Sequence, residues 1–122
     1  MYRFEKLRVY QHSIDLVEEI YRLTKMFPVD EKYALAEQLK RSSTSIALNI
    51  AEGSRGLGDI EFKSYLRNSL KSLYETAAGL KIAKRLFKVD IDLCIEKCNI
   101  VGKELNSLIK SLSNNKHPKT KD

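Results

Sequence analysis

The sequence predicts an all-α fold, specifically an antiparallel up-down-up-down four-helix bundle. Four stretches carry apolar residues three and four positions apart, the spacing that gathers them on one face of a helix. The 122-residue chain contains only five Gly and two Pro, which favours few turns and long elements. No stretch alternates apolar and polar residues for long enough to indicate a strand. Because the connections between the four stretches are short, consecutive helices should run antiparallel.

The length of the chain allows one hydrophobic core and is too short for two domains. We expect the bundle to occupy residues 1–113. Residues 114–122 are polar, basic and without periodicity, which is typical of a disordered tail.

The first helix is expected from about Arg8 to Met26, because two apolar stripes follow this stretch. One stripe consists of Leu7, Tyr10, Ile14, Val17, Tyr21 and Thr24, and the other of Leu16, Ile20, Leu23 and Phe27. Two stripes predict a buried face that is wider than a simple amphipathic helix needs. Pro28 should end the helix, since the residue before a proline is disfavoured in the α region.

The second helix should begin near Asp30, which can cap it, and end at Gly53. On a helical projection it carries an apolar lane of Leu35, Leu39, Ser42, Ile46 and Ile50. Beside this lane lies a polar lane of Gln38, Arg41, Ser45, Asn49 and Glu52. Small residues fill many remaining positions, so we expect this helix to be enclosed on more than one side. The polar lane would then form a satisfied network that fixes packing, with a ligand site as the alternative.

Residues 54–58 contain two Gly and predict a flexible break, after which Asp59 is expected to cap a third helix that ends near Leu86. The core side of this helix is predicted to hold Ile60, Leu66, Leu70, Leu73, Ala77 and Leu80. The fourth helix carries a heptad pattern of Cys94, Cys98, Val101, Leu105, Leu108 and Leu112.

The sequence lacks the usual parts of an enzyme, so we expect no catalysis, no metal and no cofactor. Neither His12 nor His117 has a partner at metal-ligand spacing, and His12 is expected to be an ordinary surface residue of the first helix. No Gly-rich phosphate-binding motif is present. Cys94 and Cys98 lie one helical turn apart, which is not the CxxC spacing, and are expected to be small buried hydrophobes. No signal peptide and no apolar run of about 20 residues is apparent, which predicts a cytoplasmic protein without a membrane span.

The second helix also carries a resemblance to a known family. The runs Gln38–Arg41 and Asn49–Gly53 and the pair Ser45 and Ile46 resemble the signature of small four-helix bundles encoded in intervening sequences of bacterial 23S rRNA genes. Further matching positions are Phe4, Leu7, Phe27, Pro28, Glu31, Ser72 and Glu75, whereas Ser69 and Lys71 stand where the family usually has Ala and Gly. The resemblance implies a homopentamer without known catalysis. Similar bundles are accessory proteins of diversity-generating retroelements, which implies a reverse transcriptase as a partner.

The third helix carries the strongest functional signal, a stripe without acidic residues that is about 100° wide and roughly 37 Å long at a rise of ~1.5 Å per residue. This stripe, called the basic stripe below, consists of Lys63, Arg67, Lys71, Tyr74, Lys81, Arg85 and Lys88. Solvated helix faces usually mix charges of both signs, so an uninterrupted stripe favours binding to phosphates. Tyr74 lies in its middle and could stack on an exposed base.

A formal charge of +6 also favours an anionic partner. We therefore expect a homo-oligomeric protein that binds RNA or DNA and has no enzymatic activity. The alternative hypothesis is a protein-interaction scaffold whose basic faces meet an acidic protein.

Overall fold

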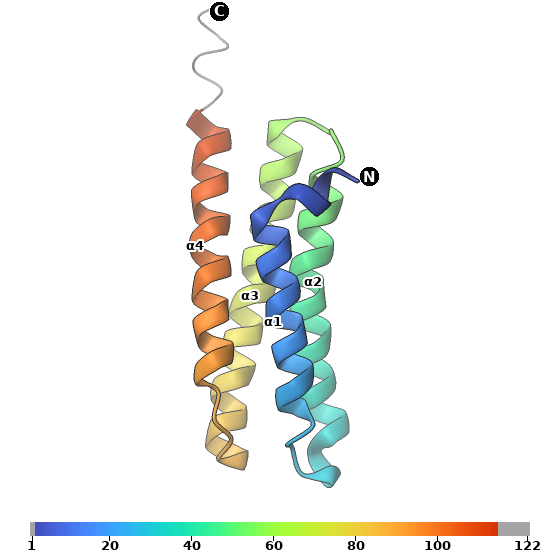
Figure 1. Ribbon diagram of the computed structural model, residues 1–122, viewed down its shortest axis with the longest axis vertical. Coiled ribbons are helices and arrows are strands. Elements are labelled where there is room, and N and C mark those ends of the chain that lie inside the picture. Colours follow the sequence, from blue (N-terminus) through green and yellow to red (C-terminus); the bar gives the residue numbers. More distant parts are fainter. Residues whose placement is uncertain (1, 115–122) are drawn as a thin grey trace, which may run out of the picture.

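Four long helices stand side by side in the computed structural model, which describes residues 2–114 apart from the side chains of residues 31–33. They are α1 (Arg8–Thr24), α2 (Glu37–Gly53), α3 (Asp59–Phe87) and α4 (Asp92–Asn114). Each helix packs against the next and α4 packs against α1, so the chain reverses at every connection (Figure 1). The all-α four-helix bundle is confirmed, and the described range contains no strand. The predicted tail beyond Asn114, with His117, lies outside the described residues.

The ends of the first two helices differ from the sequence prediction. α1 ends at Thr24 rather than Met26, with Lys25 at its C-cap. A short 3-10 helix over Val29–Glu31 and a π-helical segment over Lys32–Ala36 then lead into α2. The chain therefore becomes helical near Asp30, as predicted, but regular α-helical geometry begins only at Glu37. A further 3-10 helix, Arg3–Lys6, precedes α1.

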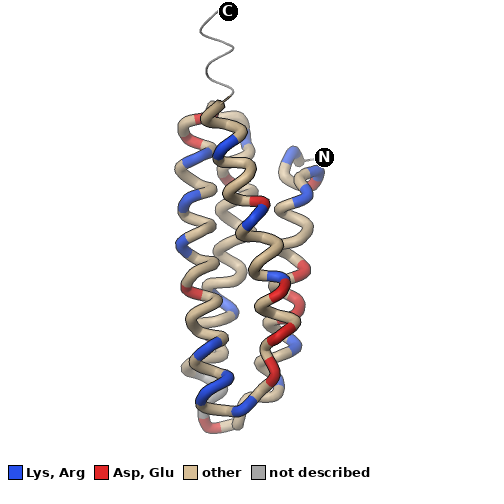
Figure 2. The backbone as a smooth tube through the Cα atoms, turned by 90° about the vertical axis from the view of Figure 1, so that its left-hand side faces the viewer, with Lys and Arg blue, Asp and Glu red and all other residues tan. Residues whose placement is uncertain are grey.

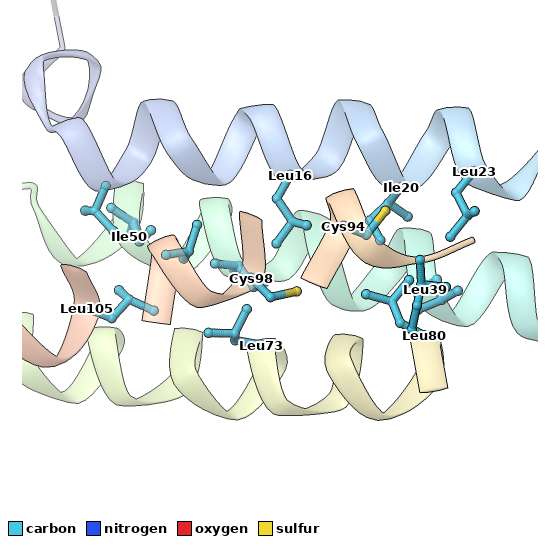
Figure 3. Close-up of a cluster of buried hydrophobic side chains, with 14 of the residues drawn as sticks. Leu16, Ile20, Leu23, Leu39, Ile50, Leu73, Leu80, Cys94, Cys98 and Leu105 are labelled. Carbon is cyan, nitrogen blue, oxygen red and sulfur yellow. The ribbon is translucent and has the colours of Figure 1, made fainter. Parts of the chain in front are cut away.

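The core fills the space between the four helices with branched side chains (Figure 3). One predicted stripe of α1 lies in it, because Leu16, Ile20, Leu23 and Phe27 are all buried. The other stripe is only partly covered, and Tyr21 on it is 42% exposed. The α4 heptad is buried throughout except at Leu108, which is half-buried against the core.

The prediction for the start of α3 was wrong at two positions. Gly58, with φ of 100°, occupies the N-cap, so Asp59 is the first helical residue and not the cap. Ile60, expected in the core, is 64% exposed, whereas Phe62 is 8% exposed and faces inward. Two positions along a helix correspond to about 200° of rotation, so Ile60 and Phe62 point in nearly opposite directions.

The most extensive helix contact joins α2 and α3 and includes two glycines. A Cβ atom placed on Gly53 would lie 2.6 Å from Cβ of Tyr65, and one placed on Gly79 would lie 2.8 Å from Cδ2 of Leu39. Both distances are below normal van der Waals contact. The lack of a side chain at Gly53 therefore lets α2 and α3 approach, whereas at Gly79 it leaves room for the end of the Leu39 side chain.

Replacing Gly53 with Ala should destabilise the protein by about 1–3 kcal/mol, since the new methyl group would press on the Tyr65 side chain close to its backbone. Helix propensity alone predicts the opposite sign, a gain of up to about 1 kcal/mol. Urea unfolding followed by circular dichroism measures the difference. Gly102→Ala is the control, because its Cβ would meet only the flexible end of Leu73, at 3.2 Å, and should be close to neutral. Equal effects of the two substitutions would contradict the close contact at Gly53.

Candidate nucleic-acid interface

The basic stripe lies on the side of α3 that faces away from the core. Leu66, Leu73 and Leu80 turn the opposite side of the helix into the bundle. Four cations of the stripe are exposed along nearly the whole length of α3, namely Arg67, Lys71, Lys81 and Arg85. The regular 3.6-residue repeat of an uninterrupted helix keeps them on one side.

The two ends of the stripe differ from its middle. The ammonium of Lys63 donates a hydrogen bond to Oγ of Ser113, at 3.2 Å, and the Lys63 side chain is half-buried between α3 and α4. Lys88 is not in the helix as the projection assumed. It forms the C-cap with φ of 59° and ψ of 30°, and its backbone N–H donates to the carbonyl of Lys84.

Tyr74 is the most exposed large hydrophobic side chain on α3, with 77% of its surface accessible. α3 packs on α2 and α4, and a tyrosine on such a helix can bury its ring against either of them. Here the ring stands at the surface between the cations of the stripe, where an incoming aromatic group can reach it.

The charge along α3 is uneven (Figure 2). Basic residues recur along the helix on the left of the view, while acidic ones gather toward the right-hand side of the bundle. Glu75, the acidic residue nearest the middle of α3, accepts a hydrogen bond from Gln38 at 3.4 Å and thus lies on the α2 side. The stripe itself remains free of acidic residues over its described length.

Part of this charge pattern has a structural explanation. Asp59 and Glu61 lie in the first turn of α3, and Lys84 and Arg85 in the last, an arrangement that suits the helix dipole. The dipole acts mainly on the first and last turns. It therefore gives no reason for Arg67, Lys71 and Lys81, which lie in the interior of the helix.

The polar lane of α2 is more exposed than the sequence indicated. Gln38, Arg41 and Glu52 are exposed, and only Ser45 and Asn49 are half-buried. Ser45 accepts a hydrogen bond from Ser72 of α3 at 2.9 Å, and Asn49 donates to the Ser45 backbone. Within this chain the centre of the polar lane is therefore half-buried and its two ends are exposed.

A buried hydrogen-bond network of hydroxyl groups lies between α2 and α3, closer to the core than the polar lane. Ser42 and Thr76 share a hydrogen bond of 2.7 Å, and Ser69 donates to the backbone carbonyl of Ile46 at 2.9 Å. All three side chains are at most 5% exposed. The sequence signal for this network was the presence of small hydroxyl residues at core-facing positions. Ser42 stands in the apolar lane of α2, and Ser69 and Thr76 stand on the core side of α3.

His12 was expected to be an ordinary surface residue, but it joins two helices. Its Nδ1 lies 2.8 Å from a carboxylate oxygen of Glu104 on α4. The pair is partly buried and fixes α1 against α4. No group of three or more potential metal ligands occurs in the described part of the chain.

The two cysteines are free and buried, as predicted. Burial raises the pKa of the Cys94 thiol to about 11 and that of Cys98 to about 12. The thiolate is the nucleophilic form of cysteine, so neither thiol is activated at neutral pH.

A four-helix bundle with an exposed basic helix face defines the structural class of the protein. Residues 5–112 match the family described as 23S rRNA-intervening sequence protein, and the chain belongs to this family. The expected resemblance is thereby confirmed for the family, and the relation to the retroelement proteins stays a prediction.

One solved structure is similar over most of the chain. It is a protein with unknown function from the S23 ribosomal protein family of Bacteroides thetaiotaomicron, with 24% identity and a TM-score of 0.61. The match covers 85% of this chain and 94% of that one and supports the fold. No curated protein matches. Across residues 2–114, none of the helices is both long and apolar enough to cross a membrane.

At pH 8, thiol-reactive reagents should label native Cys94 and Cys98 at least about 100-fold more slowly than a small free thiol, because burial both protonates and covers the sulfur atoms. Labelling should become fast and involve both residues when the protein is unfolded in guanidinium chloride. Absorbance of the released thiol reagent measures the two rates. Fast labelling of the native protein would show that one of the thiols is activated or exposed.

Proposed function

We propose that the protein is a non-enzymatic, homo-oligomeric accessory protein that binds nucleic acid through the basic stripe of α3. The observation that carries this proposal is the row of exposed cations with Tyr74 at its centre. Arg and Lys side chains contact phosphates on any sequence, and an exposed aromatic ring adds stacking on unpaired bases. The family name, which refers to an intervening sequence of 23S rRNA, is consistent with such a partner.

The length of the stripe suits a nucleic-acid backbone. From Lys63 to Arg85 the helix rises roughly 33 Å at ~1.5 Å per residue. One turn of duplex DNA measures about 34–36 Å. Phosphates can therefore be contacted at several points along a single helix, although each exposed contact contributes little by itself.

Self-association would strengthen such weak contacts by repeating the stripe. Several branched side chains lie uncovered on the outer sides of α2 and α3, with Leu48 at 65%, Ile82 at 49% and Leu86 at 62% exposure. Three of the four neighbours of Leu48 on the helix surface are small, namely Thr44, Ser45 and Ala51, and the fourth is Glu52. Apolar groups of this kind are commonly covered by a second copy. The family resemblance suggests five copies, and simultaneous contacts on one strand would then act together.

The same resemblance also suggests a protein partner. Retroelement accessory bundles act beside a reverse transcriptase, so a complex of RNA or cDNA with such an enzyme is the setting that we propose to test. The alternative of a protein-interaction scaffold predicts an acidic protein on the same stripe in place of nucleic acid.

Replacing Arg67, Lys71 and Lys81 together with Gln should weaken binding to all nucleic-acid sequences, since phosphate contacts do not depend on sequence. The log–log slope of affinity against salt should become shallower by about 2–3, because each lost phosphate contact on duplex accounts for about 0.9. Fluorescence anisotropy at several salt concentrations measures both quantities.

The matched control for this triple variant is Lys6, Arg8 and Lys25 replaced with Gln, which removes the same charge from exposed positions at or near α1. It should have a smaller effect on both affinity and slope. Equal losses would show that net charge alone attracts nucleic acid. No binding by the unaltered protein at low salt would favour the scaffold.

Replacing Leu48 with Glu should lower the mass of the assembly, because a carboxylate would have to be desolvated at the contact between copies. The chain mass is 14.0 kDa, so multi-angle light scattering should report a multiple of this value for the unaltered protein. Met26→Glu is the control at a 71% exposed apolar residue outside α2 and α3, and should keep the mass. A mass of one chain for the unaltered protein at micromolar concentration would contradict self-association.

A further inference from the structure

An open groove lies beside Tyr74, between α3 and α4. Its volume is about 470 Å³, within the ~300–1,000 Å³ range common for small-ligand pockets. Its floor is apolar and consists of Leu73, Ala77, Cys98 and Gly102. The groove therefore offers a surface that can bury one flat, weakly polar group.

Small residues on both helices explain why this space is open. Ala77 of α3 and Gly102 of α4 line the groove, and both are only half-buried. A Cβ atom on Gly102 would already lie 3.2 Å from Cδ2 of Leu73. Larger residues at these two positions would fill the groove from either side.

Three polar or aromatic side chains form the rim. Tyr74 is exposed on α3, and Lys103 is exposed on α4 across the groove. Asn99 is exposed on α4 one turn before Lys103. The Asn99 amide supplies both a donor and an acceptor, which is what the edge of a nucleobase requires. Lys103 supplies a positive charge on α4, on the far side of the groove from the basic stripe.

We propose that this groove receives an unstacked base of a single-stranded nucleic acid whose backbone follows the basic stripe. The base would lie against the apolar floor and the Tyr74 ring, with its polar edge toward Asn99. This inference rests on the proposed function and adds to it a site that prefers unpaired strands. Base–aromatic stacking and an electrostatic track are the two elements that such sites combine.

The neighbouring cations are placed to hold the strand on both sides of the inserted base. Lys71 lies about 5 Å before Tyr74 along the helix axis and Lys81 about 10 Å after it, at a rise of ~1.5 Å per residue. Both are exposed. Positive charge at the rim distinguishes this groove from an apolar face that only a second copy would cover, and it complements phosphates.

The groove should discriminate between single strands and duplexes, while the basic stripe should not. Bases inside a duplex are stacked and paired, so they cannot enter without the cost of unpairing. Phosphates are available to the stripe in both forms. A change confined to the groove should therefore alter binding to single strands alone.

The test fills the groove without changing charge, by Ala77→Met. The matched control is Ala34→Met, the same substitution at an exposed residue of the π-helical segment, outside both the groove and the basic stripe. Binding is measured by fluorescence anisotropy at one low salt concentration, with a 12-nucleotide single strand and a 12-base-pair duplex. Single strands of DNA and RNA of the same sequence are used in separate arms.

Ala77→Met should weaken single-strand binding about 10-fold, the effect expected from losing one stacked base, and change duplex binding less than about 2-fold. Ala34→Met should bind both as the unaltered protein does. A loss on either the DNA or the RNA strand supports the groove and identifies its ligand. Tyr74→Ala should reproduce the loss, and since this ring is 77% exposed its removal should leave helicity and melting temperature unchanged.

Several results would overturn the proposal. Equal losses on single strand and duplex, or no loss with Ala77→Met and Tyr74→Ala, would show that no base enters the groove. A change in assembly mass on Ala77→Met would show that a second copy covers it instead. If the unaltered protein binds both forms and only the stripe variants matter, the groove proposal fails and the proposed function stands. If the unaltered protein binds neither form, both fail.

Discussion

The contact between α2 and α3 is the constraint on which the rest of the bundle depends. Gly53 lacks the side chain that would keep these two helices apart, and Gly79 leaves room for the end of Leu39 between them. The buried hydrogen bond between Ser42 and Thr76 and that from Ser69 to the Ile46 carbonyl then link them at close range. Buried polar groups are costly when left without partners, so these bonds also fix how far one helix can slide along the other. No described buried side-chain polar atom lacks a partner.

This contact determines which side of α3 faces water. Once the residues that meet α2 and the core are fixed, the cations one or two positions away must point outward, because each step along a helix turns the side chain by about 100°. α4 packs beside them, and its small residues at the contact leave a groove next to Tyr74. The basic stripe and the groove therefore belong to one surface. Neither needs any residue of the α2–α3 contact, so the outer surface can be altered while the fold is kept.

Sequence patterns were sufficient to predict the four helices and most of the buried core residues. The heptad in α4 and the second stripe of α1 were correct because burial follows a strict 3–4 spacing. Ile60 was misplaced because its apolar character was taken as burial, although its position relative to Phe62 puts it on the outer side. The end of α1 and the π-helical lead into α2 depend on local backbone geometry that periodicity does not encode.

The candidate site was only partly visible in the sequence. The exposed cations follow from one helix and could be projected, whereas the groove requires residues from two helices about 25 positions apart. Asn99, Gly102 and Lys103 gave no sign of this role, since their relation to Tyr74 is set by how α3 and α4 pack. His12 was similarly misjudged, because its partner Glu104 lies on another helix.

Lys88 occupies a backbone conformation that favours glycine. Its φ of 59° places a side-chain-bearing residue in the left-handed region, at a cost of roughly 1–2 kcal/mol. Glycine is the usual residue at such helix ends because it avoids this cost. The chain has instead a cation at the position where the basic stripe ends. If that cation serves binding, the protein gives up some stability for activity at this turn. A variant with glycine at this position would then be more stable and would bind its ligand more weakly.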